Sequence, residues 1–91
     1  MSGQEYRIEA EVVNRAEAAG FVVRKVQWIG RRGAPDRVFL GGGRCVWIEF
    51  KAPGQKPEGQ QARELERLKK AYAEVYVCDN VKDALDILGI K

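Results

Sequence analysis

Residues 33–54, GAPDRVFLGGGRCVWIEFKAPG, decide the fold of this 91-residue chain. Two runs rich in β-branched and aromatic residues flank three consecutive glycines. This pattern is typical of a β-hairpin, because glycine supplies the positive φ angles that a tight reversal needs. Three charged residues, Asp36, Glu49 and Lys51, lie at the far ends of these runs, where apolar side chains would be expected. Their presence indicates a site that needs charge at the open end of the hairpin.

The register of the hairpin determines where these charges meet. Side chains alternate along a strand, so Glu49 and Lys51 share one face and lie about 7 Å apart. A two-residue turn at Gly42–Gly43, or a four-residue loop over 41–44, pairs Asp36 with Glu49, with their Cβ atoms roughly 5 Å apart. An odd-length turn or a bulge would break this pairing. The same register gives this face an apolar floor, formed by Val38, Leu40, Cys45 and Trp47.

Two opposed carboxylates are destabilising unless a cation lies between them. The chain contains no histidine, which excludes imidazole ligands and histidine-based acid–base chemistry. Any metal is therefore expected to bind through oxygen, as Mg²⁺ and Mn²⁺ do. Such an ion lowers the pKa of a bound water and clamps phosphate oxygens, and Lys51 would orient the nucleophile or offset developing charge. This chemistry is phosphodiester hydrolysis.

The remaining elements are predicted from periodicity, and they give the order αβββαβα. The expected helices cover 5–19, 58–72 and 81–88, and the expected strands outside the hairpin cover 21–28 and 75–78, the last of them buried. Gly20 ends the first helix, whereas Asn80 caps the last helix and Gly89 ends it. The fold class is therefore α/β, with a small mixed sheet flanked by helices.

The helices supply further candidates for the site. Glu5 and Glu9 fall on the apolar stripe of the first helix, whereas Glu11 does not, so either acid could complete a metal shell or bind a second ion. Gln61 heads the buried stripe of the 58–72 helix and could reach the site. Gln60 lies about 100° away around that helix and should not reach it.

Composition adds broad limits. A net charge of +3 and a pI near 9.0 fit a polyanionic partner without establishing one. The chain has no apolar run near the roughly 20 residues needed to span a bilayer and no signal-peptide core, so a cytosolic protein is expected. Cys45 and Cys78 lie in apolar runs, which suggests buried thiols in a reducing compartment. Arg31, Arg32 and Lys56 lie on loops beside the proposed site, where they could neutralise phosphates.

The motifs of this chain resemble a known nuclease family. APDR, followed after the hairpin by IEFK, resembles the PD-(D/E)XK nuclease signature. The order and spacing of EYRIE, AAGF, GAPDRVFL, VWIEFKAPGQKP, Q and VYV are similar to the VRR-NUC (virus-type replication-repair nuclease) branch over nearly the whole chain. The resemblance implies one domain over 1–91, with a restriction-endonuclease-like αβββαβ core and a short C-terminal helix. That branch is similar to Holliday junction resolvases.

The resemblance also implies roles for individual residues. The implied catalytic set is Asp36, Glu49, Lys51, Glu9 and Gln61, and the implied metal ligands are Asp36, Glu49, Phe50, Glu9 and Glu5. Asp36 and Glu49 correspond to the family's metal-binding acids, Lys51 to its catalytic lysine and Gln61 to its downstream glutamine. Glu9 ranks ahead of Glu5 because its distance from Gly20 resembles that of the resolvase glutamate.

The functional hypothesis is a Mg²⁺- or Mn²⁺-dependent endonuclease for branched DNA, including four-way junctions, acting in DNA repair in the cytoplasm of a bacterial or phage-infected cell. Stand-alone phage and bacterial members of the branch are typically homodimers. A symmetric junction needs two cuts, and a C2 dimer supplies the two active sites. The alternatives are a non-catalytic nucleic-acid-binding module and a nuclease for linear or flapped DNA, including a restriction-type enzyme specific for one duplex sequence.

Overall fold

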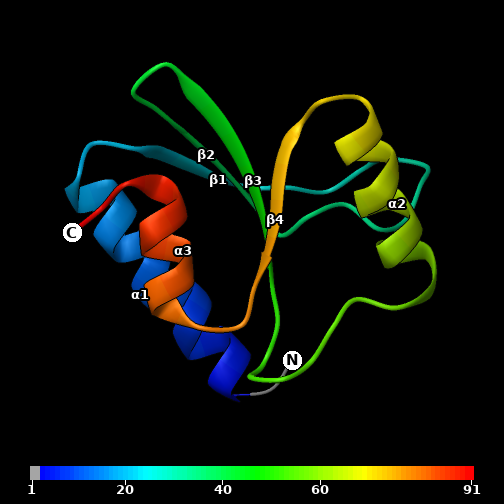
Figure 1. Cartoon of the computed structure of the whole chain (residues 1–91), viewed down its shortest axis with the longest axis horizontal. Helices are drawn as coiled ribbons and strands as arrows, with labels where there is room; N and C mark the ends of the chain where they lie inside the picture. The colour runs from blue at the N-terminus through cyan, green and yellow to red at the C-terminus, as the bar shows by residue number, and fades with distance from the viewer. Residues whose placement is uncertain (1–2) are drawn as a thin grey trace.

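The computed structural model describes residues 3–91, and in that range the chain forms three helices and one four-stranded sheet (Figure 1). The elements are α1 (Gly3–Ala18), β1 (Val22–Lys25), β2 (Arg37–Gly41), β3 (Arg44–Phe50), α2 (Gly59–Lys70), β4 (Glu74–Cys78) and α3 (Val81–Leu88). The sheet order is β1-β2-β3-β4, with β1, β2 and β3 antiparallel and β4 parallel to β3. The predicted order and the mixed α/β sheet are confirmed. No helix within 3–91 is long and apolar enough to cross a membrane.

The glycine turn sets the register that the sequence predicts. Gly42 and Gly43 form a two-residue turn with φ angles of 57° and 77°. Positive φ at both central positions is the requirement of a type I′ turn, whose twist matches that of the flanking strands. Val38 pairs with Trp47 and the ladder ends at the pair Arg37–Ile48, so one further step places Asp36 opposite Glu49.

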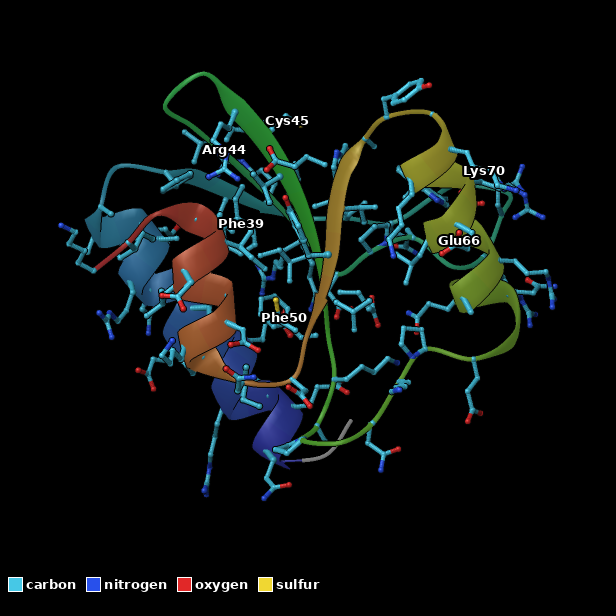
Figure 2. All side chains as sticks on the ribbon, in the orientation of Figure 1. Phe39, Arg44, Cys45, Phe50, Glu66 and Lys70 are labelled. Carbon is cyan, nitrogen blue, oxygen red and sulfur yellow. The ribbon has the colours of Figure 1, made fainter. Side chains whose placement is uncertain are left out.

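The main core lies between the sheet and the helices α1 and α3. Phe39 and Phe50 are fully buried there and meet edge to face, with ring centroids 6.4 Å apart (Figure 2). Alternation along β3 sends Val46, Ile48 and Phe50 into this core, and all three are 0% exposed. The helices contribute Val12, Ala16, Ala84 and Leu88 to the same cluster. Burial of this face fixes the opposite face as the one that carries Glu49.

Among the helices, α2 alone covers the opposite face, and only in part. Leu65 of this helix and Val75 of β4 are buried. The hairpin extends beyond α2, so its outer half stays open (Figure 1). Leu40 is 39% exposed and Cys45 is also exposed, so the expectation of a buried thiol at Cys45 is wrong. Cys78 is buried as predicted, and desolvation raises the pKa of its thiol to about 11.

Two strands differ from their predictions, the first in extent and the last in burial. The first strand was expected over 21–28 but spans Val22–Lys25, because the chain leaves the sheet after Val26 N donates to Asp36 O at 3.0 Å. The last strand was expected to be buried. Val75 and Cys78 are buried, but Val77 is 37% exposed. β4 is the last strand of the sheet, and in the described chain no further strand covers its outer edge.

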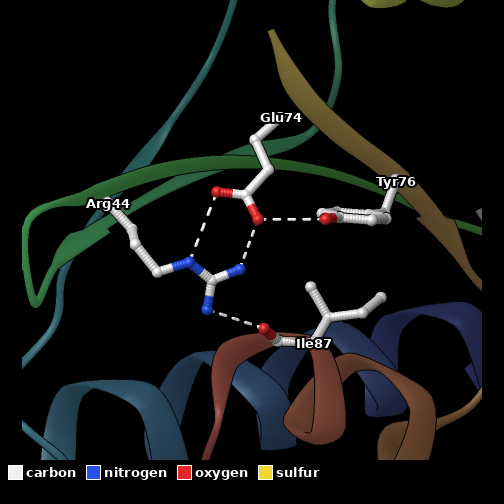
Figure 3. Close-up of polar contacts among 4 residues, drawn as sticks. All are labelled: Arg44, Glu74, Tyr76 and Ile87. Carbon is white, nitrogen blue, oxygen red and sulfur yellow. Dashed lines mark hydrogen bonds and ion pairs between the residues drawn. The ribbon is translucent and has the colours of Figure 1, made fainter.

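Polar contacts attach α3 to the sheet at the end remote from Asp36. The Arg44 guanidinium forms an ion pair with Glu74 and donates to the Ile87 carbonyl at 2.8 Å, and the Tyr76 hydroxyl donates to Glu74 at 2.9 Å (Figure 3). The hydrogen bond from Arg44 lowers the pKa of Glu74. Asn80 caps α3 by accepting from Asp83 N at 2.8 Å, as predicted.

The loop between β1 and β2 packs directly onto the first turns of α2. Gly33 has a φ of +96°, and a Cβ atom there would lie 2.9 Å from Gln60 O and 3.0 Å from Glu64 Cβ. Contacts below 3.0 Å to a backbone atom force the chain to move. This close approach couples the position of α2 to the segment that carries Asp36, directly before β2.

Gly30 and Gly33 provide a matched test of this contact. Both have positive φ, but a Cβ at Gly30 would meet no atom within 4 Å. Gly30→Ala should lower the free energy of unfolding by about 1 kcal/mol, the cost of a left-handed alanine. Gly33→Ala should cost about 1–3 kcal/mol more, because the added methyl overpacks the contact with α2. Urea unfolding measures both values, and equal losses would contradict the contact.

Candidate active site

The structure brings Asp36 and Glu49 together at the open end of the hairpin. Asp36 is half-buried, and its Oδ2 accepts a hydrogen bond from Phe50 N at 2.8 Å. Glu49 is 2% exposed. Burial and then the charge of Asp36 raise the pKa of Glu49 to about 7, and burial also raises the pKa of Asp36. Glu49 therefore resists ionisation while Asp36 is charged.

Only one of the two carboxylate oxygens of Glu49 has a partner. Its Oε2 lies 3.3 Å from Lys51 Nζ, whereas its Oε1 is buried without a hydrogen-bond partner among residues 3–91. An unpaired buried carboxylate oxygen is costly, and most such groups in proteins have a partner. The donor set is all oxygen, which suits a hard divalent cation. The pair Asp36 and Glu49 therefore fits such an ion.

The described residues contain no preformed cluster of three or more Asp, Glu, Cys or His side chains that could hold a metal ion. Two carboxylates fill only part of the coordination shell of a divalent cation, so other ligands must occupy the remaining positions. Mg²⁺ in proteins usually keeps several waters and is held by one or two carboxylates together with substrate phosphates. The geometry around Asp36 and Glu49 matches that limited protein contribution.

Lys51 joins this carboxylate pair to an open cavity of about 560 Å³. Its backbone N donates to Cys78 O at 3.0 Å, which holds the residue against β4 just beyond the end of β3. The cavity is lined by Glu5, Lys51, Ala52, Gln55, Lys56, Glu58 and Gln61. Four of the residues singled out in the sequence, Glu5, Lys51, Lys56 and Gln61, thus line one cavity.

The two acids of α1 take different positions. Glu9 is 4% exposed and accepts from Arg37 Nε at 2.6 Å, on the core side of the sheet. It does not line the cavity, whereas Glu5 does. The charges of both Glu9 and Glu5 raise the pKa of Asp36, so both act on the site. Their ranking as metal ligands stays a prediction.

Arg37 was not singled out in the sequence, although alternation contained the signal. It lies two residues before Phe39, so it shares the core face of β2. A guanidinium on a core face requires a buried partner, and Glu9 is that partner. Phe50 buries its ring in the core and its backbone N is bonded to Asp36, so only its carbonyl oxygen remains as a candidate ligand.

The two glutamines at the start of α2 separate as predicted. Gln61 lines the cavity beside Lys51, whereas Gln60 lines a second depression together with Arg31 and Arg32. Lys56 lies at the first cavity. The three basic residues predicted to contact DNA are therefore divided between two neighbouring hollows.

Comparison with known proteins places the chain in a family. No protein-family model matches it. It is 40% identical over 78 residues to the "Putative nuclease p44" of Acyrthosiphon pisum secondary endosymbiont phage 1, covering 85% of this chain and 84% of that protein. A solved structure described as "VRR_NUC domain" matches with a TM-score of 0.86 and 34% identity over 97% of both chains. The chain belongs to the VRR_NUC family of nuclease domains, with its restriction-endonuclease-like α/β fold, as the sequence resemblance implies.

The raised pKa of Glu49 predicts an unusual pH dependence of stability without metal. The folded protein holds this proton up to a pKa of about 7, against an ordinary value of 4.5, so between these values unfolding releases a proton. The free energy of unfolding should therefore fall as pH rises through that window, by up to roughly 3 kcal/mol. Urea unfolding in EDTA from about pH 5 to 8 measures it. Glu49→Gln should flatten the curve, and a wild-type stability that rises through the window would contradict the assignment.

Proposed function

We propose that this protein is a divalent-metal-dependent endonuclease that cuts branched DNA in the manner of a Holliday junction resolvase. The observation that carries the proposal is the pair of half-buried Asp36 and buried Glu49, with Glu49 Oε1 unpaired and Lys51 Nζ 3.3 Å from its other oxygen. A carboxylate pair of this kind is expensive for folding alone. Its position beside a cavity in a nuclease domain supports a catalytic role.

In this mechanism Asp36 and Glu49 would hold Mg²⁺ or Mn²⁺, with the Phe50 carbonyl and an acid from α1, Glu9 or Glu5, as further ligands. When bound, the ion would supply a water of lowered pKa and neutralise phosphate oxygens. Lys51 orients the attacking water and offsets charge that develops on the phosphate. Gln61, which lines the same cavity, positions the water or the strand. Glu9 joins the shell only if it exchanges its ion pair with Arg37.

The proposed substrate and assembly follow from charge and size. Arg31, Arg32 and Lys56 flank the site and would neutralise DNA phosphates on a chain with a net charge of +3. Residues 1–91 form one domain with one active site in this proposal, so paired cuts across a four-way junction require a homodimer. The exposed edge of β4 offers a surface for it. The protein would act on replication or repair intermediates in the cytoplasm of a bacterial or phage-infected cell.

A substrate panel tests the activity directly. Wild type should cut a four-way junction in Mg²⁺ or Mn²⁺ and cut flaps, forks and linear duplex more slowly. Asp36→Asn should lose more than about 100-fold in rate, because it removes a metal-binding charge but keeps an oxygen to accept from Phe50 N. Cys45→Ala, an exposed position on β3, is the matched control and should cut normally.

Two outcomes of the panel would overturn the proposal. If wild type binds the junction and cuts no DNA in either metal, the protein is a non-catalytic nucleic-acid-binding module. If cleavage is confined to one linear duplex sequence, the protein is a restriction-type enzyme.

Metal binding can be measured without cleavage. At about pH 8, Mg²⁺ or Mn²⁺ should raise the free energy of unfolding of wild type, by about 2.7 kcal/mol when the ion is at 100 times its dissociation constant. Glu49→Gln should lose most of this gain, since it removes one of the two ligands. Lys51→Met should keep the gain and yet fail to cut, because lysine acts on the phosphate and not on the ion. Equal stabilisation of wild type and Glu49→Gln would place the ion elsewhere.

A further inference from the structure

The second depression, with a volume of about 380 Å³, lies between the β1–β2 loop and α2 and is lined by Gly30, Arg31, Arg32, Gln60, Arg63 and Arg67. We propose that it is a separate DNA-backbone site that binds a phosphate other than the one being cut. The inference rests on the proposed function in taking DNA as the ligand. It adds Arg63 and Arg67 of α2, which the sequence patterns did not single out.

A buried acid, Glu64, holds two of the arginines that line the depression. Glu64 has a side chain that is 9% exposed, and its Oε2 accepts from Trp28 Nε1 at 2.9 Å. Its Oε1 lies 3.0 Å from Arg67 and 3.5 Å from Arg31. Trp28 in turn packs on Trp47 of β3, with ring centroids 5.8 Å apart. One carboxylate therefore holds a guanidinium from the loop and one from the helix in place over the sheet.

The positive charge of the depression exceeds its negative charge. Four guanidinium groups line it, and Glu64 pairs with two of them, those of Arg31 and Arg67. In the described part of the chain neither Arg32 nor Arg63 forms an ion pair. Guanidinium groups held together in this way repel one another until an anion lies among them. Their planar donor forks match the oxygens of a phosphate, which makes a phosphodiester backbone the fitting ligand.

The position of the depression ties it to the cleavage site. Gln60 lines the depression, and the next residue, Gln61, lines the cavity that contains Lys51. The Cα atoms of consecutive residues lie about 3.8 Å apart, so one turn of α2 forms the wall between the two hollows. Gly33 keeps this turn against the loop that carries Arg31 and Arg32. DNA seated at Lys51 therefore has neighbouring backbone within reach of the arginines.

Salt dependence of binding tests the proposal, because each phosphate contact releases counterions. The probe is a fluorescent four-way junction, bound by the Asp36→Asn protein in EDTA so that cleavage plays no part. In that background Arg32→Ala/Arg63→Ala should weaken binding roughly 10-fold or more and reduce the slope of log K against log salt by about 0.9 per lost contact, measured between about 50 and 200 mM KCl. These two arginines are exposed, so their removal leaves no buried charge behind.

Matched variants separate a specific site from general charge. Arg15→Ala/Lys82→Ala removes two positive charges from α1 and α3, on the other side of the sheet, and should leave the slope unchanged. Arg32→Lys/Arg63→Lys should restore most of the slope. If the arginine pair and its control behave alike, the depression is not a phosphate site.

The results can refute the second site without refuting the proposed function, and the reverse also holds. If wild type cuts junctions but Arg32→Ala/Arg63→Ala leaves the salt slope unchanged, only the second site is wrong. If wild type cuts no DNA while the arginine pair lowers the slope as expected, the second site stands and the nuclease proposal falls.

Discussion

The two-residue turn at Gly42–Gly43 is the constraint on which the site depends. Side chains alternate with a period of two, so a slip of one residue in the β2–β3 ladder would move Glu49 into the main core and break its pairing with Asp36. The apolar residues of the hairpin enforce the same register, because Phe39, Val46 and Ile48 all enter one core. Packing on one face thus determines the chemistry of the other.

The end of the hairpin that carries Asp36 and Glu49 lowers the stability of the fold, and the rest of the structure compensates for this loss. Two carboxylates meet there, one of them buried with an unpaired oxygen, while the core beneath them is apolar and closely packed. Sites of this kind, where local rules of folding are broken, are expected where function requires them. The polar contacts at the other end of the sheet, centred on Arg44 and Glu74, show the ordinary case in which each charge has its partner.

Two consecutive residues at the start of α2 line two different hollows. Gln61 faces the cavity with Lys51, and Gln60 faces the arginine-lined depression. The close contact of Gly33 with this turn holds loop and helix together. The short helix α2 therefore contributes residues both to the proposed catalytic cavity and to the proposed phosphate-binding depression beside it.

Local patterns in the sequence determined the order of elements, the hairpin register, the Asn80 cap and the separation of Gln60 from Gln61. These features depend on periodicity and on turn chemistry over a few residues, and both can be read directly from the sequence. Only the tertiary structure decided the exposure of Cys45 and Val77, the pairing of Glu9 with Arg37, and the gathering of Arg31, Arg32, Arg63 and Arg67 around Glu64. These features depend on how far α2 covers the sheet and on which distant segments meet across it, and no local period of the chain encodes those contacts.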